Sequence, residues 1–185
     1  MKNNSYGKAR VLDKSQVIDL FAELSKNPRD ACLFAICFFT ACRISEALQL
    51  HTQDFMAGTI TLRKATTKGK LKSRTIPIHA ALEPYLLAYQ PKKPGAMFPG
   101  QCGMGNTYLD RVTAHRILRS ACKKIGIVGV STHSFRRTAL TFMSENGTPL
   151  REIQEVSGHA DLGTLQKYLE VSPAQTKRAV NSIWL

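Results

Sequence analysis

Acidic residues are scarce in this sequence. Only 13 aspartates and glutamates stand against 26 lysines and arginines, which gives the 185 residues a formal charge of +13 and a pI near 9.8. Such an imbalance is typical of proteins that bind polyanions. Nucleic acid is therefore the first candidate partner, and an anionic membrane surface is the second.

Long hydrophobic runs and an export signal are missing as well. The longest apolar run, Ala31 to Cys42, is far shorter than the roughly 20 residues that span a bilayer. The polar first residues lack the apolar core of a signal peptide. The five cysteines include no C-x-x-C pair, so we expect reduced core residues rather than disulfides. These features predict a soluble cytoplasmic protein, and the basic charge suggests that it associates with the nucleoid.

Three common kinds of catalytic site have no counterpart in the sequence. The histidines and cysteines lack zinc-ligand spacing, no G-x-S-x-G motif occurs, and the acids are too scattered for a two-metal phosphodiesterase site. We therefore expect neither a metal nor another cofactor. The remaining candidates for chemistry are cationic side chains, together with histidine and tyrosine.

Helical periodicity and capping signals dominate what is present. Asp13 and Gln16 form a capping box, and Asn27-Pro28 opens a segment apolar enough to be the buried central helix. Later helices are predicted around residues 82–89, 113–125, 132–146, 149–157 and 173–183. Residues 1–10 are basic and aperiodic, so we expect a loose arm, followed by a single domain over 11–185 that ends in a tail helix.

One segment has the alternating pattern of strands instead. Residues 59–62 and 75–78 alternate polar and apolar side chains around a Lys68-Gly69-Lys70 turn, which predicts a β-hairpin. Pro77 places its second strand at a sheet edge. The predicted fold class is therefore mainly α with a small antiparallel sheet. Six cations and no acid lie between Arg63 and Arg74, so the hairpin is either a solvated edge or a finger that reaches a phosphate backbone.

The last third of the chain gathers the residues with most chemistry. His133 and Arg136 project from one face of a first helical turn if Ser131 or Thr132 caps it. A bend between Asp161 and Gly163 could bring the His159 imidazole close to the Tyr168 phenol.

A second cationic site follows the central helix. Arg43 ends the apolar run, and Glu46 lies on the same face three residues later. A buried ion pair between them is the simplest structural explanation of this arginine.

Taken in order, these motifs resemble the catalytic domain of the tyrosine recombinase (phage integrase) family over about Val11 to Ile183. The resemblance implies catalytic roles for six residues and a supporting role for Glu46, which would orient Arg43. The six are Arg43, Lys68, His133, Arg136, His159 and Tyr168. Two positions depart from the family: Ala41 stands where glycine is frequent, and Ser157 where leucine often precedes Gly-His.

The resemblance also implies an activity and its partners. Tyr168 would cleave DNA through a 3′-phosphotyrosyl intermediate, without ATP or metal, and rejoin it as a site-specific recombinase. Double-stranded DNA and other protomers, four in a synaptic complex, would be the partners, and no membrane is implied. Predicted DNA contacts are Arg63, Lys64, Lys70, Lys72, Arg74, Arg116, Arg119 and Arg137.

Three other interpretations stay open at this point. The chain lacks the N-terminal domain common in the family, so it is either a minimal, catalytic-domain-only recombinase or a fragment. A type IB topoisomerase would use related chemistry to relax supercoils. A basic DNA-binding module would bind DNA without cleaving it.

Overall fold

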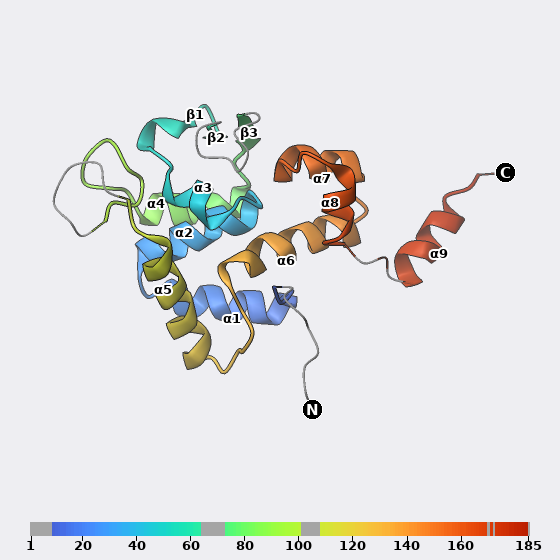
Figure 1. The fold of residues 1–185 in the computed structure, drawn as a ribbon, viewed down its shortest axis with the longest axis horizontal. Coiled ribbons are helices and arrows are strands. Elements are labelled where there is room, and N and C mark those ends of the chain that lie inside the picture. The colour runs from blue at the N-terminus through green and yellow to red at the C-terminus, as the bar shows by residue number, and fades with distance from the viewer. Residues whose placement is uncertain (1–8, 64–72, 101–107, 170, 172, 185) are drawn as a thin grey trace.

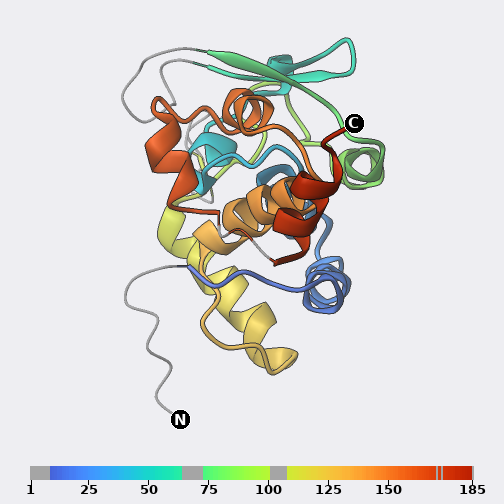
Figure 2. The ribbon, with the colours of Figure 1, turned by 90° about the vertical axis from the view of Figure 1, so that its right-hand side faces the viewer.

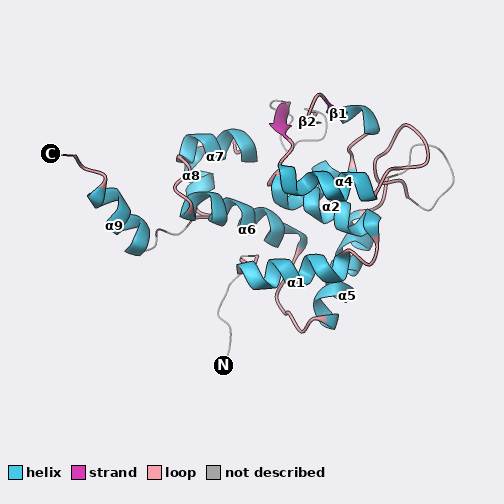
Figure 3. Ribbon diagram, turned by 180° about the vertical axis from the view of Figure 1, so that it is seen from behind, coloured by secondary structure: helices cyan, strands magenta, loops and turns pink. Residues whose placement is uncertain are grey.

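The fold is mainly helical, with one small antiparallel sheet (Figure 3). A computed structural model describes residues 9–63, 73–100, 108–169, 171 and 173–184. The helices are α1 (Lys14–Leu24), α2 (Pro28–Phe39), α3 (Ile44–Leu48), α4 (Glu83–Ala88), α5 (Arg111–Lys124), α6 (Thr132–Glu145), α7 (Leu150–Ser157), α8 (Leu162–Gln166) and α9 (Pro173–Asn181), with 3-10 turns at Thr52–Asp54 and Ala80–Leu82. The predicted fold class is confirmed.

Helix α2 is the centre of the main hydrophobic core. Asn27 caps it through its side chain, and every residue from Asp30 to Cys37 is buried. It packs against α1, α3, α4 and α6 (Figure 1). Phe34 of α2 stacks on Phe135 of α6, with ring centroids 5.1 Å apart. The prediction of a buried central helix is therefore confirmed.

The sheet lies on the opposite side of the central helices from α1 and α5 (Figure 2). Its strands are β1 (Phe55–Met56), β2 (Thr59–Leu62) and β3 (Arg74–Pro77), in that order and all antiparallel. Ile60 pairs with Ile76, and both point into the core. The predicted hairpin is confirmed, with Pro77 on an edge strand. Its turn, including Lys68, lies outside the described residues.

Helix α6 joins the main core to a smaller second core. Its residue Phe135 is buried in the first. Further along the helix, Leu140 packs with Ile153 of α7 and Leu165 of α8 in the second. Figure 1 shows α7 and α8 as a lobe at the far end of α6. The two cores place the Arg136 turn of α6 between them.

The segment before α1 is attached to the body. Arg137 Nη1 donates to the Ala9 carbonyl at 2.6 Å, and Arg10 Nη1 donates to the Val128 carbonyl at 2.7 Å. The Leu12 amide donates to Thr138 Oγ1 at 3.0 Å. Residues 9 and 10, predicted as the end of a loose arm, are thus tied to α6 and to the turn before it.

The tail helix α9 touches the body through polar bonds. Gln175 Nε2 donates to the Ser144 carbonyl at 2.9 Å, and Arg178 Nη1 donates to the Glu145 carbonyl at 2.9 Å. Apolar residues at its end stay outside these contacts: Val180 of the helix and Ile183 beyond it are exposed, and Trp184 is 93% exposed.

The four cysteines that the structure describes, Cys32, Cys37, Cys42 and Cys122, are buried and free, as expected for reduced core residues. Cys102 lies outside the described residues. In the part of the chain that the structure covers, no helix is both long and apolar enough to cross a membrane.

The turn between α2 and α3 depends on a left-handed residue. Ala41 has φ 48° and is fully buried. This conformation costs an L-residue about 1–2 kcal/mol. Glycine at this position would avoid that cost.

We therefore expect Ala41→Val to lower the free energy of unfolding by about 2 kcal/mol or more, since a β-branched side chain is both strained and overpacked there. Ala41→Gly should change it by less than about 1 kcal/mol, because relief at φ offsets the lost methyl group. Ala57, with the same φ of 48° but exposed, is the control: Ala57→Gly should stabilise. Urea denaturation measures all three, and equal losses for valine and glycine at Ala41 would contradict the account.

Candidate active site

A buried carboxylate lies at the centre of the candidate site. Glu46 is fully buried in α3, and its Oε2 accepts the backbone N–H of Arg43 at 2.7 Å. Arg74 of β3 binds the same carboxylate with both ends of its fork: Nη1 lies 3.2 Å from Oε1 and Nη2 3.0 Å from Oε2. Bidentate pairing of this kind is strong and directional.

Arg74, which was predicted as a DNA contact, forms its bonds within the protein. Besides Glu46, its Nε donates to the Val156 carbonyl of α7 at 3.0 Å, and the side chain is only 10% exposed. Arg74 therefore joins β3, α3 and α7 rather than facing solvent. This role of Arg74 could not be predicted from the sequence, because Glu46 lies 28 residues away and no local pattern links them.

A glycine makes room for the Arg74 guanidinium. Gly158 ends α7 in a left-handed conformation, with φ 66°. A Cβ at this position would lie 2.8 Å from Arg74 Nη1 and 3.0 Å from its Cζ. The first distance is shorter than real Cβ atoms show and the second is unusually tight. Glycine is therefore favoured here both by the left-handed turn and by the close approach of the Arg74 side chain.

Arg43 forms the predicted ion pair with Glu46, but its contact is longer than the two contacts of Arg74 with the same carboxylate. Its Nη1 lies 3.4 Å from Glu46 Oε1, and its side chain is 22% exposed. Burial by itself raises the pKa of Glu46, but the hydrogen bonds and charge of Arg74 outweigh it, with help from Arg43. The net effect is a lowered pKa. The carboxylate is therefore ionised, and Arg43 retains access to solvent.

Arg136 lies against His159 inside the same cluster. The Arg136 side chain is 3% exposed, and its Nη1 donates to the Ala41 carbonyl at 2.6 Å. Its Nη2 lies 3.1 Å from His159 Nε2. Burial and the nearby charge of Arg43 lower the pKa of Arg136 to about 10, which leaves it protonated at neutral pH.

His159 is held neutral and lies against the tyrosine. Burial, then the charges of Arg136, Arg43 and Arg74, lower the pKa of His159 to about 4. The ring centroids of His159 and Tyr168 are 5.3 Å apart. Asp161 caps α8 between them through Thr164, so the predicted bend brings the two rings together as expected.

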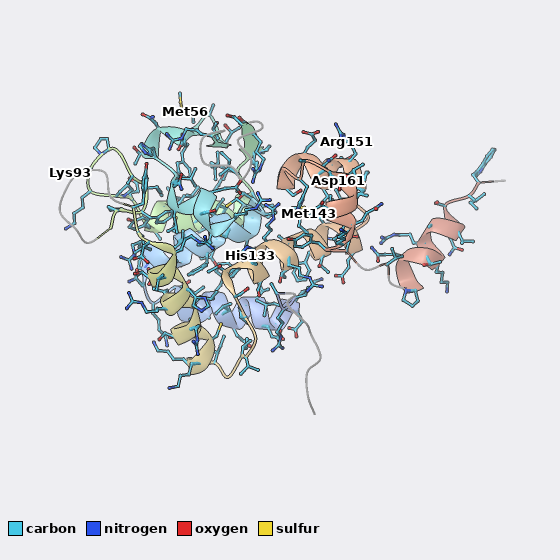
Figure 4. The ribbon with its side chains drawn as sticks, in the orientation of Figure 1. Met56, Lys93, His133, Met143, Arg151 and Asp161 are labelled. Atoms are coloured by element: carbon cyan, nitrogen blue, oxygen red, sulfur yellow. The ribbon has the colours of Figure 1, made fainter. Side chains whose placement is uncertain are left out.

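His133 begins the turn of α6 that carries Arg136, and its side chain is exposed. Figure 4 shows it at the end of α6 nearer to α2 and α3, with Arg151 and Asp161 on the lobe of α7 and α8. Arg43, Arg136, His159 and Tyr168 therefore meet, with His133 at the same helical turn. Lys68 lies outside the described residues.

The predicted DNA contacts fall into three groups. Arg63 pairs with Asp54 at 3.1 Å and donates to the Gln49 carbonyl, while Arg137 holds Ala9. Arg116 and Arg119 are exposed on α5. The remaining predicted contacts, Lys64, Lys70 and Lys72, lie outside the described residues. DNA contact by any of these groups stays a prediction.

The net charge of the candidate site, which contains three arginines, Glu46 and His159, favours binding of an anionic ligand. Three guanidinium groups share one carboxylate: Arg43 and Arg74 pair with Glu46, and Arg136 interacts with its charge, while the adjacent imidazole is neutral. An anion placed beside Arg43 and Arg136 would balance the excess charge. A phenol next to such an anion is positioned for nucleophilic attack on it.

Glu46→Gln should lower the free energy of unfolding by about 3 kcal/mol, because it leaves the buried Arg74 charge without its counter-ion. The matched control is Glu155→Gln, whose ion pair with Arg151 is exposed on both sides. That change should cost less than about 0.5 kcal/mol. Chemical denaturation at pH 7 measures both, and comparable small losses would refute the central role of Glu46.

The stability that Glu46 contributes to the fold depends on pH in a definite direction. The folded pKa of Glu46 lies below the model-peptide value of 4.5. Its stabilisation is therefore complete above that pH and is lost as pH falls towards the folded pKa. Glu46→Gln should remove this part of the acid dependence.

Comparisons with known proteins agree with this geometry. The Phage integrase family matches residues 10–175. Tyrosine recombinase XerC of Bifidobacterium longum (strain DJO10A) is 30% identical over 95% of this chain and 51% of its own length. The chain thus spans about half the length of the curated relatives it matches.

Two solved structures are similar in fold. The catalytic domain of bacteriophage HP1 integrase superimposes with a TM-score of 0.72 at 25% identity, with 95% of each chain covered. XerH site-specific recombinase bound to difH substrate gives a TM-score of 0.76 at 24% identity, covering 100% of this chain and 57% of that one. The chain belongs to the phage integrase family of tyrosine recombinases.

Proposed function

We propose that this chain catalyses site-specific DNA recombination, cleaving and rejoining strands through a 3′-phosphotyrosyl intermediate. The observation that carries the proposal is the Tyr168 ring against His159, which in turn lies against Arg136. A nucleophile, a neutral hydrogen-bonding group and a buried cation thus meet at one point. Phosphoryl transfer to a phenol uses this combination.

Arg43 and Arg136 hold the two non-bridging oxygens of the scissile phosphate. Attack builds negative charge on a pentacoordinate phosphorus. The forked guanidinium groups bind those oxygens with a geometry that lysine cannot match. His159 donates a hydrogen bond to the same phosphate. Glu46 and Arg74 keep this arrangement in place without touching the DNA.

In the proposed cleavage step, each proton that is released or taken up has an acceptor or a donor among the side chains of the site. The Tyr168 oxygen bonds to phosphorus as the bond to the 5′ oxygen breaks. His133 takes the phenolic proton, and Lys68 supplies a proton to the departing 5′ oxygen. The phosphotyrosyl bond retains the energy of the broken strand. Attack by another strand's 5′ hydroxyl therefore restores the phosphodiester without ATP or a metal.

Double-stranded DNA is the proposed substrate. The exposed Arg116 and Arg119 of α5 and the lysines of the hairpin would contact its phosphates. The solved XerH complex contains difH substrate, which supports DNA as the ligand of this fold.

Other protomers on the DNA are the proposed protein partners. Strand exchange joins four strand ends, so four active sites on two duplexes are needed. The polar attachment of α9 leaves Val180, Ile183 and Trp184 exposed. We propose that these residues dock on an adjacent protomer in the assembled complex.

Covalent trapping tests the nucleophile. A DNA duplex nicked near the site should leave the protein on a 3′ phosphate, and Tyr168→Phe should abolish the adduct while DNA affinity stays within about twofold, since only a hydroxyl is removed. Gel electrophoresis after protease digestion measures the adduct. Trapping by the Phe variant would refute the assignment. Binding without trapping by the wild type would favour a non-catalytic module, and relaxation without partner exchange would favour a topoisomerase.

A pair of tail variants tests docking between protomers. Ile183→Ala with Trp184→Ala should leave the melting temperature of the free protein within about 1 °C, because both side chains are already exposed. The same variant should lose the multimeric DNA complex in a gel-shift assay while single-site binding survives. The control, Gln175→Ala with Arg178→Ala, removes bonds within the chain and should not weaken assembly. A lower melting temperature with intact assembly in the first variant would show docking within the chain instead.

A further inference from the structure

The hydroxyl of Ser157 lies against the imidazole of His159. Ser157 is the last residue of α7 and is fully buried, and its Oγ lies 2.7 Å from His159 Nδ1. The second polar neighbour of the hydroxyl is the Gln154 carbonyl, at 3.3 Å. A serine hydroxyl has one proton to donate, so the two neighbours compete for it.

The distances decide which neighbour receives the proton. Hydrogen bonds from a hydroxyl to an oxygen are about 2.5–3.0 Å long, so the contact with Gln154 is beyond the normal range. The Gln154 carbonyl already accepts the Gly158 N–H at 2.8 Å. The opposite assignment would leave a buried hydroxyl proton with only the long contact, which is costly. The hydroxyl therefore donates to Nδ1.

Arg136 does not compete for the Nδ1 lone pair. Its Nη2 lies 3.1 Å from Nε2 and 3.4 Å from Nδ1. Nearly equal distances to both ring nitrogens place the guanidinium over the ring face, not in line with either lone pair. A cation over the face favours a neutral ring. The low pKa of His159, about 4, agrees with this charge state.

Hydrogen bonds of the Gln154 side chain fix the position of His159. Gln154 Nε2 donates to the His159 carbonyl at 2.9 Å, and Arg151 Nη1 donates to Gln154 Oε1 at 2.7 Å. The side chain of Gln154 thus locates the backbone of His159, while the hydroxyl of Ser157 orients its ring.

We infer that Ser157 is a positioning residue that holds His159 as its Nε2–H tautomer. A neutral imidazole in this form presents a hydrogen-bond donor at Nε2, whereas the other tautomer would present a lone pair and repel an anion. That the anion is the scissile phosphate rests on the proposed function.

Nitrogen NMR of the free protein at pH 7 tests the inference directly. With ¹⁵N-labelled histidine, long-range proton–nitrogen spectra distinguish protonated from unprotonated ring nitrogens. We expect Nδ1 of His159 to be unprotonated and Nε2 to be protonated. A protonated Nδ1 with an unprotonated Nε2 would overturn the inference, and so would a doubly protonated ring.

Variants separate the hydroxyl from its packing. Ser157→Thr keeps the donor and should retain the Nε2–H form, while Ser157→Ala should shift the ring towards a mixture of tautomers. Ser120→Ala, on the exposed side of α5, is the control and should change nothing. An unchanged tautomer in Ser157→Ala would contradict the assignment.

Cleavage of a nicked substrate links the tautomer to activity. Ser157→Ala should cleave more slowly, by up to about tenfold, because only part of the mixture keeps the Nε2–H donor for the phosphate, and Ser157→Thr should recover most of the rate. The NMR and cleavage results together distinguish failure of the proposed function from failure of the proposed role of Ser157. A wild type with the Nε2–H form that never cleaves DNA refutes the function alone, and a cleaving wild type with the Nδ1–H form refutes the role of Ser157 alone.

Discussion

The buried ion pair between Glu46 and Arg74 is the constraint on which the candidate site depends. Taking both charges out of water is expensive, and only the bidentate geometry and the further bond to Val156 offset that cost. The pair therefore forms only when α3, β3 and the end of α7 are all in register. Because Glu46 also binds the Arg43 backbone, the same contact sets the position of Arg43, the first of the two arginines that we propose bind the phosphate.

Excess positive charge is the second physical property of the candidate site, after the buried ion pair. Burial lowers the pKa values of Arg136 and His159, and the charge of Arg43 lowers both further, since one carboxylate cannot balance three guanidinium groups. The histidine responds by remaining neutral, and the arginine stays charged because its unperturbed pKa is so high. Repulsion of this kind lowers stability in the free protein and favours binding of an anion. Function and fold thus compete at the same residues.

Local signals explain why much of the fold was predictable. Caps at Asp13 and Asn27 and the alternation of β2 and β3 each lie within a few residues. The short elements β1, α3 and α8 have too few residues to show a period. The bend between His159 and Tyr168 was predictable from its glycines. The roles of Arg74 and Arg137 were not, because each bonds to a partner far along the chain.

Arg43 and Arg136 are proposed to act by neutralising the charge of the scissile phosphate. Replacing one non-bridging oxygen of that phosphate with a methyl group removes its negative charge, so the cleavage rates of wild type and Arg43→Ala on the two substrates provide the most direct test. Arg43 is partly exposed, which makes its removal tolerable for folding. We predict that Arg43→Ala loses at least about a hundredfold on normal DNA and far less on the uncharged substrate. An equal loss on both would contradict the claim.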